Sequence, residues 1–416
     1  MTHAEAKASS FSVRNLPEAR VAPQIVSATS ALRHACGLLL QTGAGASLTA
    51  RRAAVILSSA CSIANAQLSL PKPTGAYAVG RSLTYILDTS RVDPKAIRAD
   101  GKREFMVIVW YPAAGSLSEP KSQWIPALWA DSAASDLFIF TRRVQPPLTV
   151  REIAGVIAAT RSYARDSASV APSRRSFPVV ILSPGNNTTA AYYATLGEEL
   201  ASHGYVVIGH VPTGYARHVT LPDHRVFPRR AYSDIDPWIG DIRYLVDHVS
   251  VWNRDPLNLL HGMLDTMGIG LVGHSGGANA SEVVASSDRR VRALASIDPG
   301  ITDTSWATAK PTLILSSDWA ARASVDTAVA DMLGERVIFR RHLAHGFALT
   351  LKGAQHMSFS DISAIRRLQL GPGGLEQITA ARRLLVEFFD ESMLGAHSQL
   401  LRTGDAALGL IPTPLR

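Results

Sequence analysis

Short apolar runs alternate with longer amphipathic stretches along most of the chain, beginning at about residue 78. Several runs are continuously apolar rather than alternating, which is typical of strands buried on both faces of a sheet. Strands of this kind, separated by helical stretches, predict a mostly parallel central sheet flanked by helices. The predicted strands are Phe105 to Tyr111, Pro178 to Leu182, Tyr205 to Val211, Ile269 to Val272, Ala293 to Ile297, Thr312 to Leu315 and Phe347 to Leu351.

Three helices stand out between these runs. The stretch from Thr188 to His203 has an apolar face and ends before Gly204, a residue suited to the position after a helix. Asp236 followed by Pro237 predicts an N-cap and a first helical turn. The last predicted helix covers about residues 374–394, and the remaining residues, 396–416, form a short tail.

One segment does not fit the alternation. Residues from about 113 to 176 are too many for an ordinary connection, and they gather several aromatic side chains, including Trp124, Trp129 and Phe138. Long insertions of this kind often form a lid over an active site. The alternative is an extra helix packed on the rim, because aromatic residues at helical spacing are usually core.

Composition limits the choice of function. Of 416 residues, 46% are hydrophobic and 18% charged, which is globular composition. The net charge of +8 comes from scattered basic residues without a nucleic-acid motif, so no nucleic-acid partner is predicted. Two cysteines, Cys36 and Cys61, are too few for a disulfide framework, and no Cys/His spacing resembles a zinc site. Catalysis therefore depends on oxygen and nitrogen groups, with no metal and no cofactor predicted.

The amino-terminal region carries an export signal. Arg51-Arg52 precede an apolar run from Ala53 to Ile63, and Ala64-Asn65-Ala66 follows as an A-x-A cleavage site. We therefore expect a leader and signal peptide over residues 1–66, cleavage near Ala66, and an exported mature chain that starts at Gln67. Lipoprotein anchoring at Cys61 is not expected, because Ser58 occupies the place three residues before it where Leu is usual.

The sequence Gly-His-Ser-Gly-Gly at Gly273–Gly277 fits the pattern G-x-S-x-G, and its surroundings raise it above chance. A predicted strand precedes it, and Ala278 to Ala285 reads as a helix. A serine in this place lies on a tight strand-to-helix turn, as in the nucleophile elbow of the α/β-hydrolase fold. The helix amino terminus offers N–H groups to a developing oxyanion. Ser275 is the candidate nucleophile.

A serine hydroxyl needs a histidine base held by a carboxylate, and in this fold the chain order is Ser, acid, His. His342 and His345 lie at the start of a predicted strand, whereas His356 follows its end and is the better candidate. Asp298 and Asp318 each end a predicted strand. The fold alone favours Asp318, because the acid commonly follows the later strand.

A further donor to the oxyanion is expected after an earlier strand. The sequence Ser-Pro-Gly-Asn-Asn at Ser183–Asn187 occupies that place, and Gly185 permits a sharp turn. We expect the backbone N–H groups of Asn186 and Gly276 to form the oxyanion hole.

At these motifs the chain resembles the platelet-activating factor acetylhydrolase family, in particular its bacterial secreted members. The resemblance covers roughly residues 71–392. Its motifs are Pro73–Gly80, Ser-Pro-Gly followed by Leu200–Tyr205, the Gly-His-Ser-Gly-Gly elbow, and His356–Asp361 with its Phe-x-Asp ending. The chain departs from the family where Pro184 replaces a usual His and where Gly276 replaces a bulky residue.

The resemblance implies that the acid lies about two dozen residues after the Ser, and this spacing favours Asp298 over Asp318. It also implies a cofactor-free acyl hydrolase that acts on short or oxidised acyl chains of phospholipids. The sequence thus predicts a serine esterase with Ser275, Asp298 and His356 as triad, in one catalytic domain over residues 67–395.

The expected substrate is a small-molecule or lipid ester, with transient contact to a lipid surface, and the oligomeric state is left open. The alternatives are a broad carboxylesterase, a polyester hydrolase or a peptidase of the same fold. From another class, the alternative is a catalytically inactive α/β-hydrolase that serves as a binding module.

Overall fold

The computed structural model describes residues 67–115, 120–142, 147–300, 304–306, 308–319, 345–370 and 375–413. The proposed leader, Cys36, Cys61 and His342 lie outside these ranges. Within them, no helix is both long enough and apolar enough to cross a membrane.

The centre of the molecule is a mixed, mostly parallel sheet in the order β12-β11-β10-β9-β8-β4-β5-β2-β1-β3. Neighbours from β5 across to β11 run parallel, while β2 lies antiparallel to β5 and to β1, and β12 antiparallel to β11. The strands are β1 (Ala78–Val92), β2 (Lys102–Ala113), β3 (Arg165–Asp166), β4 (Phe177–Ser183), β5 (Val206–Val211), β8 (Leu264–His274), β9 (Val291–Ile297), β10 (Thr312–Ser317), β11 (Gly346–Leu351) and β12 (Leu410–Pro412).

Each of the seven predicted strands is present, which confirms the α/β class and the mostly parallel sheet. Strand β1 was not among them, because its apolar residues are interrupted by Arg81, Thr84 and Asp88. Arg81 is nevertheless buried, since its guanidinium pairs with Asp166 of β3 at 2.7 Å. A buried arginine of this kind makes a strand look polar in sequence.

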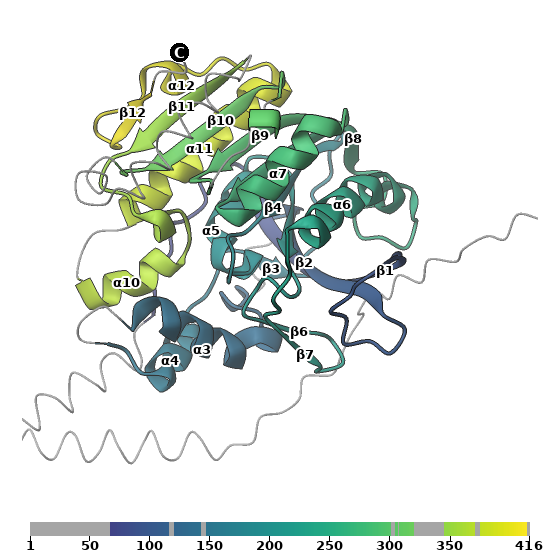
Figure 1. The fold of residues 1–416 in the computed structure, drawn as a ribbon. Helices are drawn as coiled ribbons and strands as arrows, with labels where there is room; N and C mark the ends of the chain where they lie inside the picture. Colours follow the sequence, from purple (N-terminus) through teal and green to yellow (C-terminus); the bar gives the residue numbers. More distant parts are fainter. Residues whose placement is uncertain are drawn as a thin grey trace, which may run out of the picture.

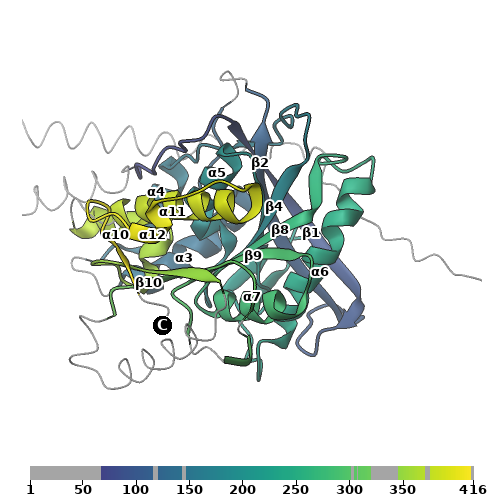
Figure 2. The same ribbon diagram turned by 90° about the horizontal axis from the view of Figure 1, so that it is seen from above.

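Helices cover both faces of the sheet, as Figures 1 and 2 show. On one face α5 packs against α11, and on the other α6 packs against α7. Their bounds are α5 (Ala194–Ser202), α6 (Asp236–Arg254), α7 (Gly276–Ser287) and α11 (Leu375–Leu394). Gly204 follows α5 with a φ of 97°, as its place after the helix predicted. The predicted N-cap of α6 was wrong by one residue, because Ile235 is the cap and Asp236 already lies in the helix.

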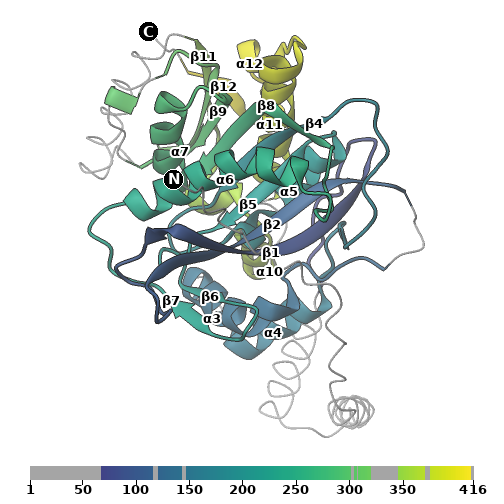
Figure 3. The same ribbon diagram turned by 90° about the vertical axis from the view of Figure 1, so that its right-hand side faces the viewer.

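The insertion folds into helices at one end of the sheet, beside a short hairpin (Figure 3). Helix α3 contacts both the hairpin strand β6 and helix α10. Trp124 and Trp129 are buried, and the Trp129 indole N–H donates to the Thr220 carbonyl at 2.8 Å. These two tryptophans are core, so a lid role for the insertion stays a prediction. The helices of the insertion are η1 (Ala127–Trp129), α3 (Ala130–Thr141) and α4 (Val150–Ala159). The neighbouring elements are β6 (His218–Thr220), β7 (Val226–Pro228) and α10 (Ile362–Leu370).

The segment after residue 395 belongs to the same sheet. Helix α12 (Leu400–Thr403) packs on α11, and β12 pairs with β11 as an antiparallel edge strand. The sheet therefore includes residues beyond 395, the end of the predicted domain.

Candidate active site

The site is built around the turn between β8 and α7. Ser275 occupies this turn with φ 55° and ψ −123°, a conformation that a residue with a side chain rarely adopts. Its N–H donates to the Ile297 carbonyl of β9 at 3.0 Å, which fixes the turn against the neighbouring strand. Strain held in this way by surrounding structure is characteristic of a nucleophile elbow. Ser275 itself is half-buried, so substrate can reach it.

Two glycines make this turn possible. A Cβ on Gly273 would lie 2.4 Å from the Gly277 carbonyl oxygen, and one on Gly277 would lie 2.2 Å from the Pro184 carbonyl oxygen. Both distances are far below van der Waals contact, so only glycine fits at either position. The motif is therefore required by the close approach of α7 to the ends of β8 and β4.

The structure brings Asp298 and His356 together from opposite sides of β10. Asp298 follows β9, is fully buried and has a φ of 41°. His356 opens the short helix η4 (His356–Phe359) after β11, and its Nδ1 lies 2.7 Å from Asp298 Oδ2. The imidazole is 35% exposed, while its carboxylate partner is not exposed at all. The buried carboxylate thus fixes the orientation of the imidazole through its Nδ1.

Three further donors hold the Asp298 carboxylate. The Ser317 N–H and hydroxyl, at the end of β10, donate at 3.0 and 2.8 Å, and the Trp319 indole N–H donates as well. These donors fix the position of the carboxylate beside His356. Sequence analysis did not single out Ser317 or Trp319, although both flank the rival acid Asp318 at a strand end.

Asp318 has a different place. Its carboxylate accepts from the Gly353 N–H at 3.0 Å, and its own N–H donates to the Ala354 carbonyl at 3.0 Å. It ties the end of β10 to the turn after β11, just ahead of His356. Asp298, rather than Asp318, is the carboxylate beside the imidazole.

The loop after β4 lies against the elbow. A Cβ on Gly276 would be 3.7 Å from the Asn186 Cβ, so the two residues expected to stabilise an oxyanion are neighbours. The same position is 3.4 Å from the ring of Trp238 on α6. The buried Trp238 indole N–H also donates to the Ser183 hydroxyl at 2.8 Å. Sequence analysis missed Trp238, which packs where a bulky residue at position 276 would point.

His274 adds a second ring to the site. It is buried, its ring centroid lies 4.6 Å from that of His356, and its Nδ1 is 2.6 Å from the Tyr193 hydroxyl. Atoms of His274, Asp298 and His356 able to bind a metal lie within 4.8 Å of one another. His274 Nδ1 thus contacts Tyr193, whereas His356 Nδ1 contacts Asp298.

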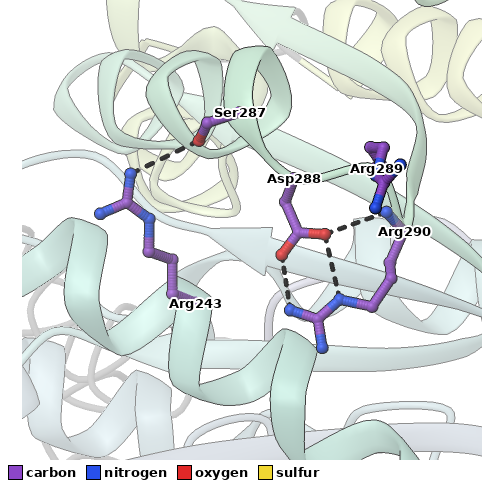
Figure 4. Close-up of a pocket in the computed structure, with 5 residues that line it drawn as sticks. All are labelled: Arg243, Ser287, Asp288, Arg289 and Arg290. Carbon is purple, nitrogen blue, oxygen red and sulfur yellow. Dashed lines mark hydrogen bonds and ion pairs between the residues drawn. The ribbon is translucent and has the colours of Figure 1, made fainter.

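A separate pocket opens at the other end of α7, lined by Arg243, Ser287, Asp288, Arg289 and Arg290 (Figure 4). The Arg290 guanidinium pairs with Asp288 and with Asp247, each at 2.6 Å. Because Ser275 precedes the first residue of this helix and Ser287 is its last, the pocket is remote from the elbow.

Two family models match parts of the chain. The model described as platelet-activating factor acetylhydrolase, isoform II, matches residues 62–211. The model described as PET hydrolase-like matches residues 169–338, which include Ser275 and Asp298. His356 lies beyond both matched segments.

Characterised relatives are cutinases. Cutinase 2 of Thermobifida cellulosilytica is 28% identical over 152 residues, which are 36% of this chain and 51% of that protein. Cutinase cut1 of Thermobifida fusca is also 28% identical over 152 residues, 42% of its length. The chain thus matches about half or less of each of these relatives.

A solved structure is similar over a longer stretch. The ferulic acid esterase from Streptomyces cinnamoneus has a TM-score of 0.65 and 25% sequence identity, covering 84% of this chain and 100% of that one. The two chains share one fold, including the flanked and mostly parallel sheet.

Proposed function

We propose that this member of the α/β-hydrolase superfamily is a serine hydrolase of carboxylic esters. The proposal draws on the similarity of the chain to two families of that superfamily, the platelet-activating factor acetylhydrolases and the PET hydrolase-like proteins. The observation that carries the proposal is the strained Ser275 at the strand-to-helix turn, together with the buried Asp298 and the half-buried His356 that it binds. Nucleophile, base and acid then follow the chain order of this fold.

In the proposed mechanism, the Ser275 hydroxyl attacks the ester carbonyl while His356 Nε2 takes its proton. Asp298 accepts the His356 Nδ1–H and stabilises the imidazolium that forms. The N–H groups of Asn186 and Gly276 stabilise the tetrahedral oxyanion. His356 then protonates the leaving alcohol, and a water molecule, deprotonated by His356, hydrolyses the acyl-enzyme.

For the substrate we propose small-molecule or lipid esters with short or oxidised acyl chains, by analogy with the acetylhydrolase model that matches the amino-terminal half. A polyester hydrolase is the second candidate, favoured by the PET hydrolase-like match across Ser275 and Asp298 and by the cutinase relatives. A panel of p-nitrophenyl esters of increasing chain length, short-chain phospholipids and a polyester film would separate the two. Turnover of phospholipid without release of soluble products from the film supports the first.

The proposal is tested with Ser275→Ala. We expect kcat to fall at least a thousandfold, and on the order of a millionfold where the triad acts as a unit. Labelling by a fluorophosphonate probe should disappear as well. Ser287→Ala, at the opposite end of α7, is the matched control and should keep both. Failure of the wild-type protein to react with the probe would favour the inactive binding module instead.

We also propose export, with a mature chain that begins at Gln67. In support, residues directly after the expected cleavage site are part of the folded domain: Leu68 and Leu70 are buried, and the Leu68 N–H donates to the Thr160 hydroxyl at 3.0 Å. Mass spectrometry of the protein from the exported fraction of its native host should find Gln67 as the first residue. A retained Cys61, with or without lipid, would contradict cleavage there.

A further inference from the structure

Tyr193 lies between the two halves of the proposed oxyanion hole. It ends the short helix η2 (Ala190–Tyr193), which leads into α5, and its ring is buried. Its hydroxyl accepts the N–H of Gly185, from the loop after β4, at 3.1 Å. The same hydroxyl lies 2.6 Å from Nδ1 of His274, the residue before the nucleophile. One oxygen thus bridges the loop that carries Asn186 and the elbow that carries Ser275 and Gly276.

The phenol at the centre of this bridge is protonated. Burial raises the pKa of Tyr193 to about 12, so the phenol keeps its proton at neutral pH. The oxygen accepts from the Gly185 N–H, and the tautomer of His274 sets which partner donates in the hydrogen bond between Tyr193 and His274 Nδ1. Thr188 also interacts with the phenol, and its hydroxyl donates to the Gly185 carbonyl at 2.6 Å. Both ends of the Gly185 peptide segment are therefore held.

The two halves are in direct contact at Gly185. A Cβ there would lie 3.0 Å from His274 Nδ1 and 3.5 Å from the Ser275 Cβ. A small shift of this loop would therefore change the separation between the Asn186 N–H and the serine. Donors to an oxyanion act only if they are placed within a few tenths of an ångström.

The residues next to Tyr193 are held by Asp361, which lies in the segment after His356. The Asp361 N–H donates to the carbonyl of the preceding residue, Tyr192, at 2.7 Å. The Asp361 carboxylate accepts from the hydroxyl and N–H of Thr195, at the start of α5. Helix η2 is thus anchored to the segment that follows His356, so Tyr193 has a rigid base from which to hold the loop.

From these contacts we propose that Tyr193 is a positioning residue, which sets the distance between the Asn186 loop and the Ser275 elbow through Gly185 and His274. The inference rests on the proposed function, because it concerns the oxyanion hole of that same site. Tyr193 acts through these two residues and does not itself touch the reacting atoms.

The test compares Tyr193→Phe with Tyr205→Phe. Tyr205 is also fully buried, but its hydroxyl donates to Asp390 at 2.6 Å, away from the elbow. Each variant loses one buried hydroxyl, so both should lose some thermal stability. Only Tyr193→Phe should lower kcat, by about tenfold to a hundredfold, with KM changed less than about threefold. The inhibition constant of a trifluoromethyl ketone, which forms a tetrahedral adduct, should rise in parallel.

A second variant keeps the test decisive if Tyr193→Phe is insoluble. His274→Gln removes the imidazole Nδ1 from the bridge and should give the same loss of kcat at nearly constant KM. Where Tyr193→Phe is soluble, the two losses should not add in the double variant, because both act through one contact. Equal activity of Tyr193→Phe and Tyr205→Phe, or an unchanged inhibition constant, would overturn the inference while leaving the esterase intact. A wild-type protein without esterase activity would overturn the proposed function instead.

Discussion

Asp298 and Asp361 are both buried aspartates, with exposed fractions of 0% and 1%, and both accept an indole N–H and a hydroxyl. The two carboxylates differ in the groups that surround them. Asp298 faces a histidine that is partly open to solvent, whereas Asp361 accepts from Trp124 and Thr195 and has the acidic Glu198 nearby. Burial and Glu198 raise the pKa of Asp361 to about 7.

This difference shows that burial and hydrogen bonding alone do not mark an active site. A perturbed pKa often indicates a functional residue. The raised pKa of Asp361 instead belongs to a buried structural residue, which links Trp124 of the insertion to Thr195 of helix α5. What distinguishes Asp298 is an ionisable partner at the carboxyl edge of the sheet, beside a reachable serine. The comparison can be tested by removing the charge from each carboxylate in turn.

Of the two carboxylates, Asp298 should give the larger effect on catalysis when it is replaced by Asn. The amide cannot hold His356 in the tautomer that accepts the serine proton, so kcat should fall up to about ten-thousandfold in a folded protein. Asp318→Asn is the matched control, because that carboxylate holds the Gly353 turn and does not bind His356. It should change kcat by less than about threefold and lower Tm slightly. The measurement is steady-state hydrolysis of a p-nitrophenyl ester alongside thermal unfolding. Loss of turnover in Asp318→Asn but not in Asp298→Asn would reverse the assignment.

Asp361→Asn should change stability rather than catalysis. Below about pH 4 the group is protonated in both folded and unfolded chains. As the pH rises further, only the unfolded chain loses its proton, so stability falls until about pH 7. A rise of the pKa from 3.8 to about 7 corresponds to roughly 4 kcal/mol at full effect. The variant lacks this loss and should gain stability over wild type between pH 4 and pH 8.

The measurement is the difference in free energy of unfolding between variant and wild type across that range, by urea denaturation. Burial also raises the pKa of Glu198, which adds to the trend in the same direction, so Glu198→Gln provides the comparison. A constant difference from pH 4 to pH 8 would mean that Asp361 is charged in the folded protein. Loss of esterase activity as large as that of Asp298→Asn would erase the contrast between the two carboxylates.

The fold was largely predictable, because strands buried on both faces are continuously apolar in sequence. Strand β1 was not predicted, because Arg81 interrupts its apolar pattern. Arg81 is buried in the fold through its contact with Asp166, a partner 85 residues away. The short edge strands β3 and β12 depend on pairing with distant neighbours and leave little local pattern. Pairing between residues that are distant in sequence is a tertiary effect, and local periodicity does not predict it.

The candidate site divides in the same way. Ser275 has a local signal, since glycine is required on both sides of the turn. The choice of Asp298 over Asp318 rested on a family spacing, because the two residues end neighbouring strands in similar contexts. Trp238 and Tyr193 gave no signal, since each reads as an ordinary aromatic residue on a helix. Their polar atoms find hydrogen-bond partners only in the folded protein, where β4, η2 and the elbow are in contact.

The smallest expected effect concerns the insertion, where the same contrast between core and site can be drawn within one helix. On α3, Leu137 is fully buried, whereas the neighbouring Phe138 is only half-buried. Helix α3 contacts α10, and α10 in turn contacts the His356 helix η4, so one helix connects the insertion to the segment that carries the proposed base. If the insertion governs access of acyl chains, Phe138→Ala should change the ratio of long-chain to short-chain ester hydrolysis a few-fold with little loss of Tm. Leu137→Ala should instead lower stability by about 2–5 kcal/mol and leave the ratio unchanged. Equal losses for all chain lengths in both variants would show that Phe138, like Trp124 and Trp129, belongs to the core.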